Sequence, residues 1–185
     1  MSISPQNLTA RLKTSKFLSE LRKHANEHSS IMSAVHDSVI CVSCGRFGSS
    51  SNENRMRVDC RDFYLVAADM WLKRPDRSFG RGPREIANIL HAGGKLRVDS
   101  HNEVMRGLFD EALRMSGGFN AQEASNSIWA AATMDVDDPR VVNVLARACV
   151  ERVKDFNAQD SANSIWAIAT LGVSDANVIS ALAQA

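Results

Sequence analysis

Apolar residues recur with the period of an α-helix in the last third of the chain, and this pattern occurs in two copies. The 30 residues that begin at Phe119 and the 30 that begin at Phe156 are identical at 17 positions, at an offset of 37 residues. In the first copy, Ala124, Ile128 and Ala131 follow helical spacing and predict an amphipathic helix over residues 121–134. The repetition indicates that each copy is one structural unit.

A second helix is predicted in each unit. In the first copy, Asp138 and Pro139 supply an N-terminal cap and a first-turn proline. The positions expected to face inward are Val142, Leu145, Ala146, Cys149 and Val153. Because one helical hairpin buries too little apolar area to be stable alone, neighbouring units must stack.

Weaker copies precede these two units. Residues 87–96 lie 38 positions before 125–134, with Asn88 in the place of Asn126 and His91 in the place of Trp129. A fainter copy begins with a helix over 38–47, followed by a polar insertion over 49–54 and a second helix over 62–73.

The predicted fold is therefore all-α, an α-solenoid of stacked helical-hairpin repeats. The expected organisation is an N-terminal helical segment over 1–37, a divergent repeat with a polar insertion and basic linker over 38–83, and repeats over 84–118, 119–155 and 156–185. The last repeat is expected to be truncated. Two interpretations of the N-terminus stand: an organelle transit peptide, since no acid precedes Glu20, or a first helix from near Thr14 with Phe17, Leu18 and Leu21 buried.

Composition narrows the class of protein. A hydrophobic fraction of 44% is typical of a globular chain and excludes wholesale disorder. The net charge of +1 excludes a uniformly basic nucleic-acid binder. However, residues 1–118 carry 18 basic and 13 acidic side chains, while residues 119–185 carry 4 and 8, so the N-terminal part is the basic one. No apolar run approaches the ~18 residues of a membrane helix.

The first helix of each unit resembles a known repeat. SNSIWA at 125–130, ANSIWA at 162–167 and the divergent ANILHA at 87–92 are similar to octotricopeptide-like repeats and to the helical repeats of FAST-kinase-domain and RAP-domain proteins. The resemblance implies single-stranded RNA binding in a mitochondrion or chloroplast, for RNA processing, stability or translation, with the cytoplasm as the alternative. The chain departs from the family in having few repeats and no recognisable RAP module.

Two sets of residues are candidates for contacting RNA. Base readout is expected from the polar starts of the first helices, with a solvated helix terminus as the alternative: Arg84, Glu85, Gln122, Glu123, Gln159 and Asp160. Phosphate contacts are expected from a basic Pro- and Gly-containing segment, with a solvated loop as the alternative: Lys73, Arg74, Arg77 and Arg81.

The repeat signature itself is interpreted as structural. Asn88, Asn126 and Asn163 are expected to hold a turn or bond a backbone carbonyl, with a base contact as the alternative. Trp129 and Trp166 are expected to be buried between units, with base stacking as the alternative.

No residues for catalysis, a cofactor, a metal or a small-molecule substrate stand out. Cys41 and Cys44 have the spacing of a redox or zinc half-site, but their position in an apolar helical segment favours burial in the core. His24 and His28, four residues apart, are expected to lie on the surface without a third ligand. The competing function is a protein-interaction scaffold of the HEAT or armadillo kind.

Overall fold

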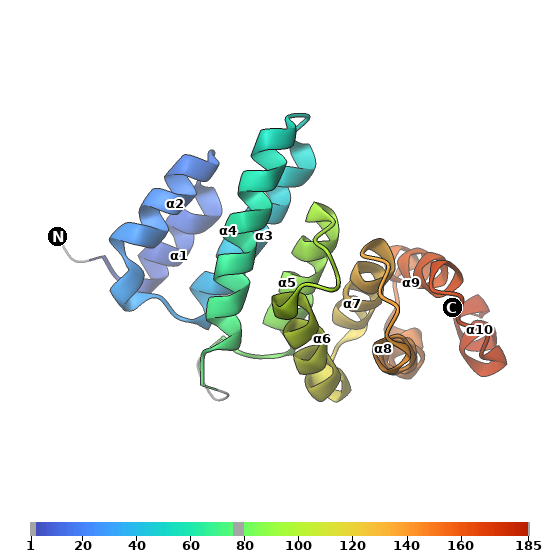
Figure 1. Cartoon of the computed structure of the whole chain (residues 1–185). Helices are drawn as coiled ribbons and strands as arrows, with labels where there is room; N and C mark the ends of the chain where they lie inside the picture. Colours follow the sequence, from blue (N-terminus) through green and yellow to red (C-terminus); the bar gives the residue numbers. More distant parts are fainter. Residues whose placement is uncertain (1–2, 76–79, 185) are drawn as a thin grey trace.

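The computed structural model describes residues 3–75 and 80–184, and within them the chain is all-helical (Figure 1). Its α-helices are α1 (Pro5–Thr14), α2 (Leu18–Glu27), α3 (Ala34–Ser50), α4 (Asn54–Leu72), α5 (Pro83–Leu96), α6 (Glu103–Met115), α7 (Ala121–Thr133), α8 (Pro139–Arg152), α9 (Ala158–Thr170) and α10 (Ala176–Ala183). Short 3₁₀ turns lie at Ser29–Ile31, Ser116–Gly118 and Val153–Asp155.

Helices that alternate in the chain pack on one another in sequence. α3 packs on α5, α5 on α7 and α7 on α9, while α4 contacts α6, α6 contacts α8 and α8 contacts α10. Figure 1 shows this progression from α3 to the C-terminal α10. Small residues allow the close approach: a Cβ placed on Gly45 of α3 would lie 3.0 Å from the Ala92 Cβ of α5.

The helix limits predicted for the clearest unit are confirmed. α7 covers Ala121–Thr133, and α8 begins at Pro139, with an Asp138 carboxylate oxygen accepting a 2.8 Å hydrogen bond from the Arg140 backbone N–H. Of the predicted inward positions, Leu145, Ala146 and Cys149 are buried, and Val142 and Val153 are half-buried.

Two predicted boundaries nearer the N-terminus are wrong. α4 begins at Asn54 rather than at residue 62, and only residues 51–53 separate it from α3, because no helix-breaking residue lies between 54 and 62. Thr14 ends α1 instead of starting a helix. Leu18 and Leu21 are buried as expected, but Phe17 is 68% exposed because it is the N-cap residue of α2.

The first helix is joined to the rest of the fold through its apolar face. Leu8 and Leu12 are fully buried, and α1 contacts both α2 and α3. Ser43 on α3 donates a 3.4 Å hydrogen bond to the Leu12 carbonyl. Residues 5–14 therefore belong to the same core as the helices that follow.

Candidate nucleic-acid interface

A stripe of accessible side chains crosses α5, α7 and α9 at equivalent positions. Spacings of four, three and four residues place each set along one face of its helix, and all twelve side chains are half-buried or exposed. We call this set the repeat stripe: Arg84, Asn88, His91 and Lys95 on α5, Gln122, Asn126, Trp129 and Thr133 on α7, and Gln159, Asn163, Trp166 and Thr170 on α9.

The three asparagines of the repeat stripe are half-buried, and their amides are unpaired. The side chains of Asn88, Asn126 and Asn163 make no hydrogen bond with the residues that the structure describes. The expected bond to a backbone carbonyl is therefore not formed, while the expected role in holding a turn stays a prediction. Each carboxamide keeps its donor and acceptor for an external partner.

The aromatic members of the stripe are only partly covered. Trp129 is half-buried, and its ring meets His91 edge-on at a centroid distance of 5.0 Å. Burial, with a smaller contribution from the Lys95 charge, lowers the pKa of His91 to about 4, so this imidazole is neutral at pH 7. Trp166 is 47% exposed, and its predicted burial is wrong: the described helices that pack on α9, which are α7, α8 and α10, leave this ring uncovered.

A groove lies between α3 and α5 at one end of the stripe. Its volume is about 420 Å³, and it contains three of the predicted readout and signature residues, Arg84, Glu85 and Asn88. Arg46 lies at its wall, where the guanidinium donates hydrogen bonds to the carbonyls of Lys13 and Ser15 at 3.1 and 2.9 Å. The remaining lining is Lys13, Val35, Ser38, Val39, Val42 and Ser43.

A second hollow brings together cations that are far apart in the sequence. Arg57, Arg61, Lys95 and Arg97 line a pocket of about 340 Å³ with no acidic side chain, which we call the basic pocket. Arg57 and Arg61 each donate to a backbone carbonyl, at 2.9 and 2.6 Å. Lys95 and Arg97 are exposed and have no side-chain partner among residues 3–75 and 80–184.

Sequence reasoning missed the basic pocket because its residues form no charge run. Arg57 and Arg61 come from the N-terminal half of α4, Lys95 from the last turn of α5 and Arg97 from its C-cap. Arg97 adopts the left-handed conformation at that cap, with φ of 50°. Only the packing of α4 against α5 places the four cations together.

Most of the predicted phosphate-binding residues form ion pairs with acidic residues of the same chain. Arg74 donates two hydrogen bonds, at 2.8 and 3.3 Å, to the fully buried carboxylate of Asp37. Lys73 pairs with Asp69 at 2.5 Å on the surface. Arg77 lies outside the described residues.

Arg81 is the most buried of the three described cations in this segment. Its side chain is only 6% exposed and pairs with Glu111 at 2.9 Å, while its guanidinium lies 5.0 Å from the centre of the Trp71 ring. Hydrogen bonds from Arg114, and then from Arg81, lower the pKa of Glu111. Arg81 therefore stabilises the junction between α4, α5 and α6 and is not accessible to a phosphate.

The acids at the helix starts serve as caps. Glu123 and Asp160 each accept a hydrogen bond from the backbone N–H of the N-cap residue, Asn120 at 2.9 Å and Asn157 at 3.2 Å. Because both carboxylates are occupied, a base-reading role for Glu123 and Asp160 is disfavoured. Gln122 and Gln159 remain exposed, and burial raises the pKa of the half-buried Glu85.

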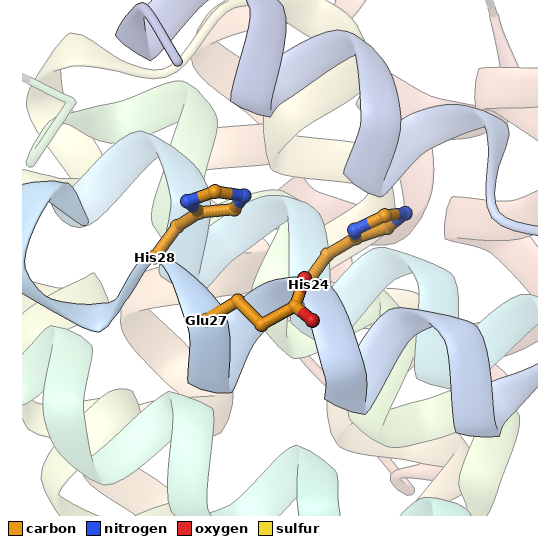
Figure 2. Close-up of side chains that lie close together, drawn as sticks. All are labelled: His24, Glu27 and His28. Carbon is orange, nitrogen blue, oxygen red and sulfur yellow. The ribbon is translucent and has the colours of Figure 1, made fainter. Parts of the chain in front are cut away.

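The cysteine and histidine expectations have different outcomes. Cys41 and Cys44 are fully buried free thiols, and burial raises the pKa of both, which confirms their core position. The expectation that His24 and His28 lack a third ligand is wrong, since Glu27 lies beside both (Figure 2).

No family model matches this chain, and no curated protein matches it. In the described part of the chain, every helix is too short or too polar to cross a bilayer.

Proposed function

We propose that this protein is an α-solenoid that binds single-stranded RNA along the repeat stripe. The observation that carries the proposal is that the carboxamides of Asn88, Asn126 and Asn163, at equivalent positions of α5, α7 and α9, have no partner in the described part of the chain. A carboxamide can pair with a base edge through two hydrogen bonds. Helical-repeat proteins read about one base per unit through such side chains.

The solenoid interpretation is supported by the order of the packing. The first helices of the units form one row, in which α7 packs between α5 and α9. The second helices form another row, in which α8 packs between α6 and α10. Neighbouring helices pack about 8–10 Å apart, so the three asparagines follow one another at a regular spacing, one per repeat unit. We call this row the asparagine ladder. A ladder of this kind suits an extended single strand.

Stacking and phosphate contacts complete the proposed surface. Trp129 and Trp166 lie one helical turn from Asn126 and Asn163 and are partly or largely exposed, and stacking on an aromatic ring is worth about 1–3 kcal/mol per base. The basic pocket begins at Lys95, the last stripe position of α5. We assign the phosphate contacts to Lys95 and Arg97 because neither side chain has a partner among the described residues.

The test is a binding titration of fluorescein-labelled single-stranded RNA, followed by anisotropy at two salt concentrations. The variant N126A/N163A is compared with N143A/N177A, which removes two exposed asparagines from α8 and α10. We expect at least tenfold weaker binding for the first variant, since each bidentate base contact is worth about 1–3 kcal/mol, and no change for the second.

The assignment of the phosphate contacts to Lys95 and Arg97 is tested by the salt dependence of RNA binding. The variant K95A/R97A should bind all RNA sequences more weakly and reduce the slope of log affinity against log salt by roughly one to two. Undetectable binding of the wild-type protein would overturn the proposal. Equal losses for N126A/N163A and N143A/N177A would overturn the role of the asparagine ladder.

The resemblance of the repeats supports a mitochondrial or chloroplast location, which imaging of a C-terminal fluorescent fusion would test. A protein-interaction scaffold is the second candidate. It is favoured by three exposed apolar side chains on α9 and α10, Ile165, Trp166 and Ile179, each 47–48% exposed. Failure of RNA binding together with a retained fold would favour this alternative.

A further inference from the structure

A histidine, a glutamate and a second histidine converge at the C-terminal end of α2. His24, Glu27 and His28 each offer a ligand atom, and these three atoms lie within 4.8 Å of one another. Figure 2 shows the rings of His24 and His28 projecting from the same side of α2, with the Glu27 carboxylate nearby. Helical spacing explains the convergence, because residues i, i+3 and i+4 share one face.

Two ring nitrogens in this cluster lack a hydrogen-bond partner. His24 Nδ1 and His28 Nε2 are buried from solvent and make no hydrogen bond with any described residue. An unsatisfied buried polar atom is costly, and native structures supply a partner in most cases. The two nitrogens lie one helical turn apart, so a single ligand placed between them can satisfy both.

The other nitrogen of His24 has a neighbouring carboxylate. His24 Nε2 lies 3.9 Å from Glu20 Oε1, one turn earlier in α2. A small rotation would bring the Glu20 carboxylate within hydrogen-bonding distance of an Nε2–H, and that tautomer leaves the Nδ1 lone pair for a ligand. Histidines that bind metals commonly have such a partner on the ring nitrogen that does not ligate.

The local charges also suit a cation. The cluster lies at the C-terminus of α2, where the last carbonyl groups carry the partial negative charge of the helix dipole. Glu20 and Glu27 add two carboxylates. Lys23 approaches Glu27 at 3.9 Å, but both side chains are well exposed, so this ion pair is weak and readily displaced.

We propose that His24, Glu27 and His28 form a binding site for a divalent transition metal of the zinc type. Two imidazole nitrogens and one carboxylate oxygen are ligands that Zn²⁺ prefers. Ligands on a tetrahedral zinc lie roughly 3.4 Å apart, given bonds of about 2.1 Å, so modest rotations of the three side chains, chiefly of the exposed Glu27, close the site. Three protein ligands leave a fourth position for water or for a group from a partner.

The site would hold the last turn of α2 together at the point where the chain leaves it for the turn at Ser29–Ile31. It is separate from the repeat stripe, so its test does not depend on RNA binding. Bound metal should raise the melting temperature, because a ligand that binds only the folded state stabilises it.

The test is a titration of metal-free protein with ZnCl₂, followed by calorimetry, with competition against a chromogenic chelator. We expect one equivalent to bind to the wild type. The variants H24A and H28A should each lose at least tenfold in affinity, and E20Q should lose about tenfold through the orientation of His24.

The matched control is H101A, which removes an exposed histidine that also lies beside two carboxylates, Asp99 and Asp137. We expect this variant to bind zinc as the wild type does. Because His24 is part-buried, its replacement could affect folding; E27Q changes an exposed side chain and provides the independent check. Undetectable zinc binding, or unchanged affinity in folded E27Q and H28A, would overturn the proposal.

Discussion

The ion pair between Arg74 and Asp37 gives a prediction whose size follows from the structure. Asp37 has no exposed surface, and Arg74 donates both hydrogen bonds that bind its carboxylate. Burial raises the pKa of Asp37 even with Arg74 in place. Replacing Arg74 by Ala leaves a buried carboxylate that must either stay charged without its partner or take up a proton.

Protonation sets an upper limit on the cost. For a carboxyl group with an ordinary pKa of 3.8, taking up a proton at pH 7 costs about 4 kcal/mol, since each pH unit is worth 1.36 kcal/mol. At pH 5 the same step costs only about 1.6 kcal/mol. We therefore expect R74A to lose about 2–4 kcal/mol of unfolding free energy at pH 7 and no more than about 1.6 at pH 5.

The sign follows from proton linkage. Loss of Arg74 raises the pKa of Asp37 in the folded state further above its unfolded value, so the variant binds a proton on folding. Its stability is retained below pH 3.8 and declines as the pH rises toward the raised folded value. Urea denaturation of wild type and R74A at both pH values measures the difference.

Two further variants make the test decisive. The double variant D37N/R74A removes the charge together with its partner, so its stability should depend less on pH than that of R74A. R84A removes an exposed arginine from α5 and should leave stability within about 0.5 kcal/mol of the wild type. A loss in R74A that is equal at pH 5 and pH 7 would refute the reasoning.

Two predictions concern packing, each measured by urea or thermal denaturation. I128A should cost about 2–5 kcal/mol, because Ile128 is fully buried, whereas I165A at the same repeat position should cost less than half as much, because Ile165 is 47% exposed; equal losses would contradict the described packing of α9. G93A should cost about 1–3 kcal/mol, because its Cβ would lie 2.7 Å from the oxygen of the buried Tyr64, and G117A, which meets nothing within 4 Å, should be close to neutral.

Helix positions in the repeated units were accessible from sequence because their signals are local. The apolar period of residues 121–134 and the Asp138 and Pro139 start correspond closely to α7 and α8. The cores of both helices also follow from that period. Where the signal was weak, as at the start of α4, the predicted boundary was wrong because no cap or breaker marked it.

The roles of the candidate site residues were harder to predict from the sequence. Arg74 and Arg81 are arginines in a basic segment, which is equally typical of a phosphate-binding loop and of a buried ion-pair network. The choice depends on Asp37 and Glu111, which lie 37 and 30 residues away in the chain. No local pattern encodes such a distant pairing.

The sequence by itself determined an all-helical chain, the limits of α7 and the start of α8, and core positions such as Leu145, Ala146 and Cys149, because periodicity and capping act over a few residues. Only the tertiary structure decided which polar groups are left for a ligand. The fold pairs Arg74 with Asp37 and Arg81 with Glu111, and the packing of α4 on α5 forms the basic pocket. The amides of Asn88, Asn126 and Asn163 have no partner among residues 3–75 and 80–184. Whether a polar side chain is free depends on partners that are distant in sequence, and folding alone brings them together.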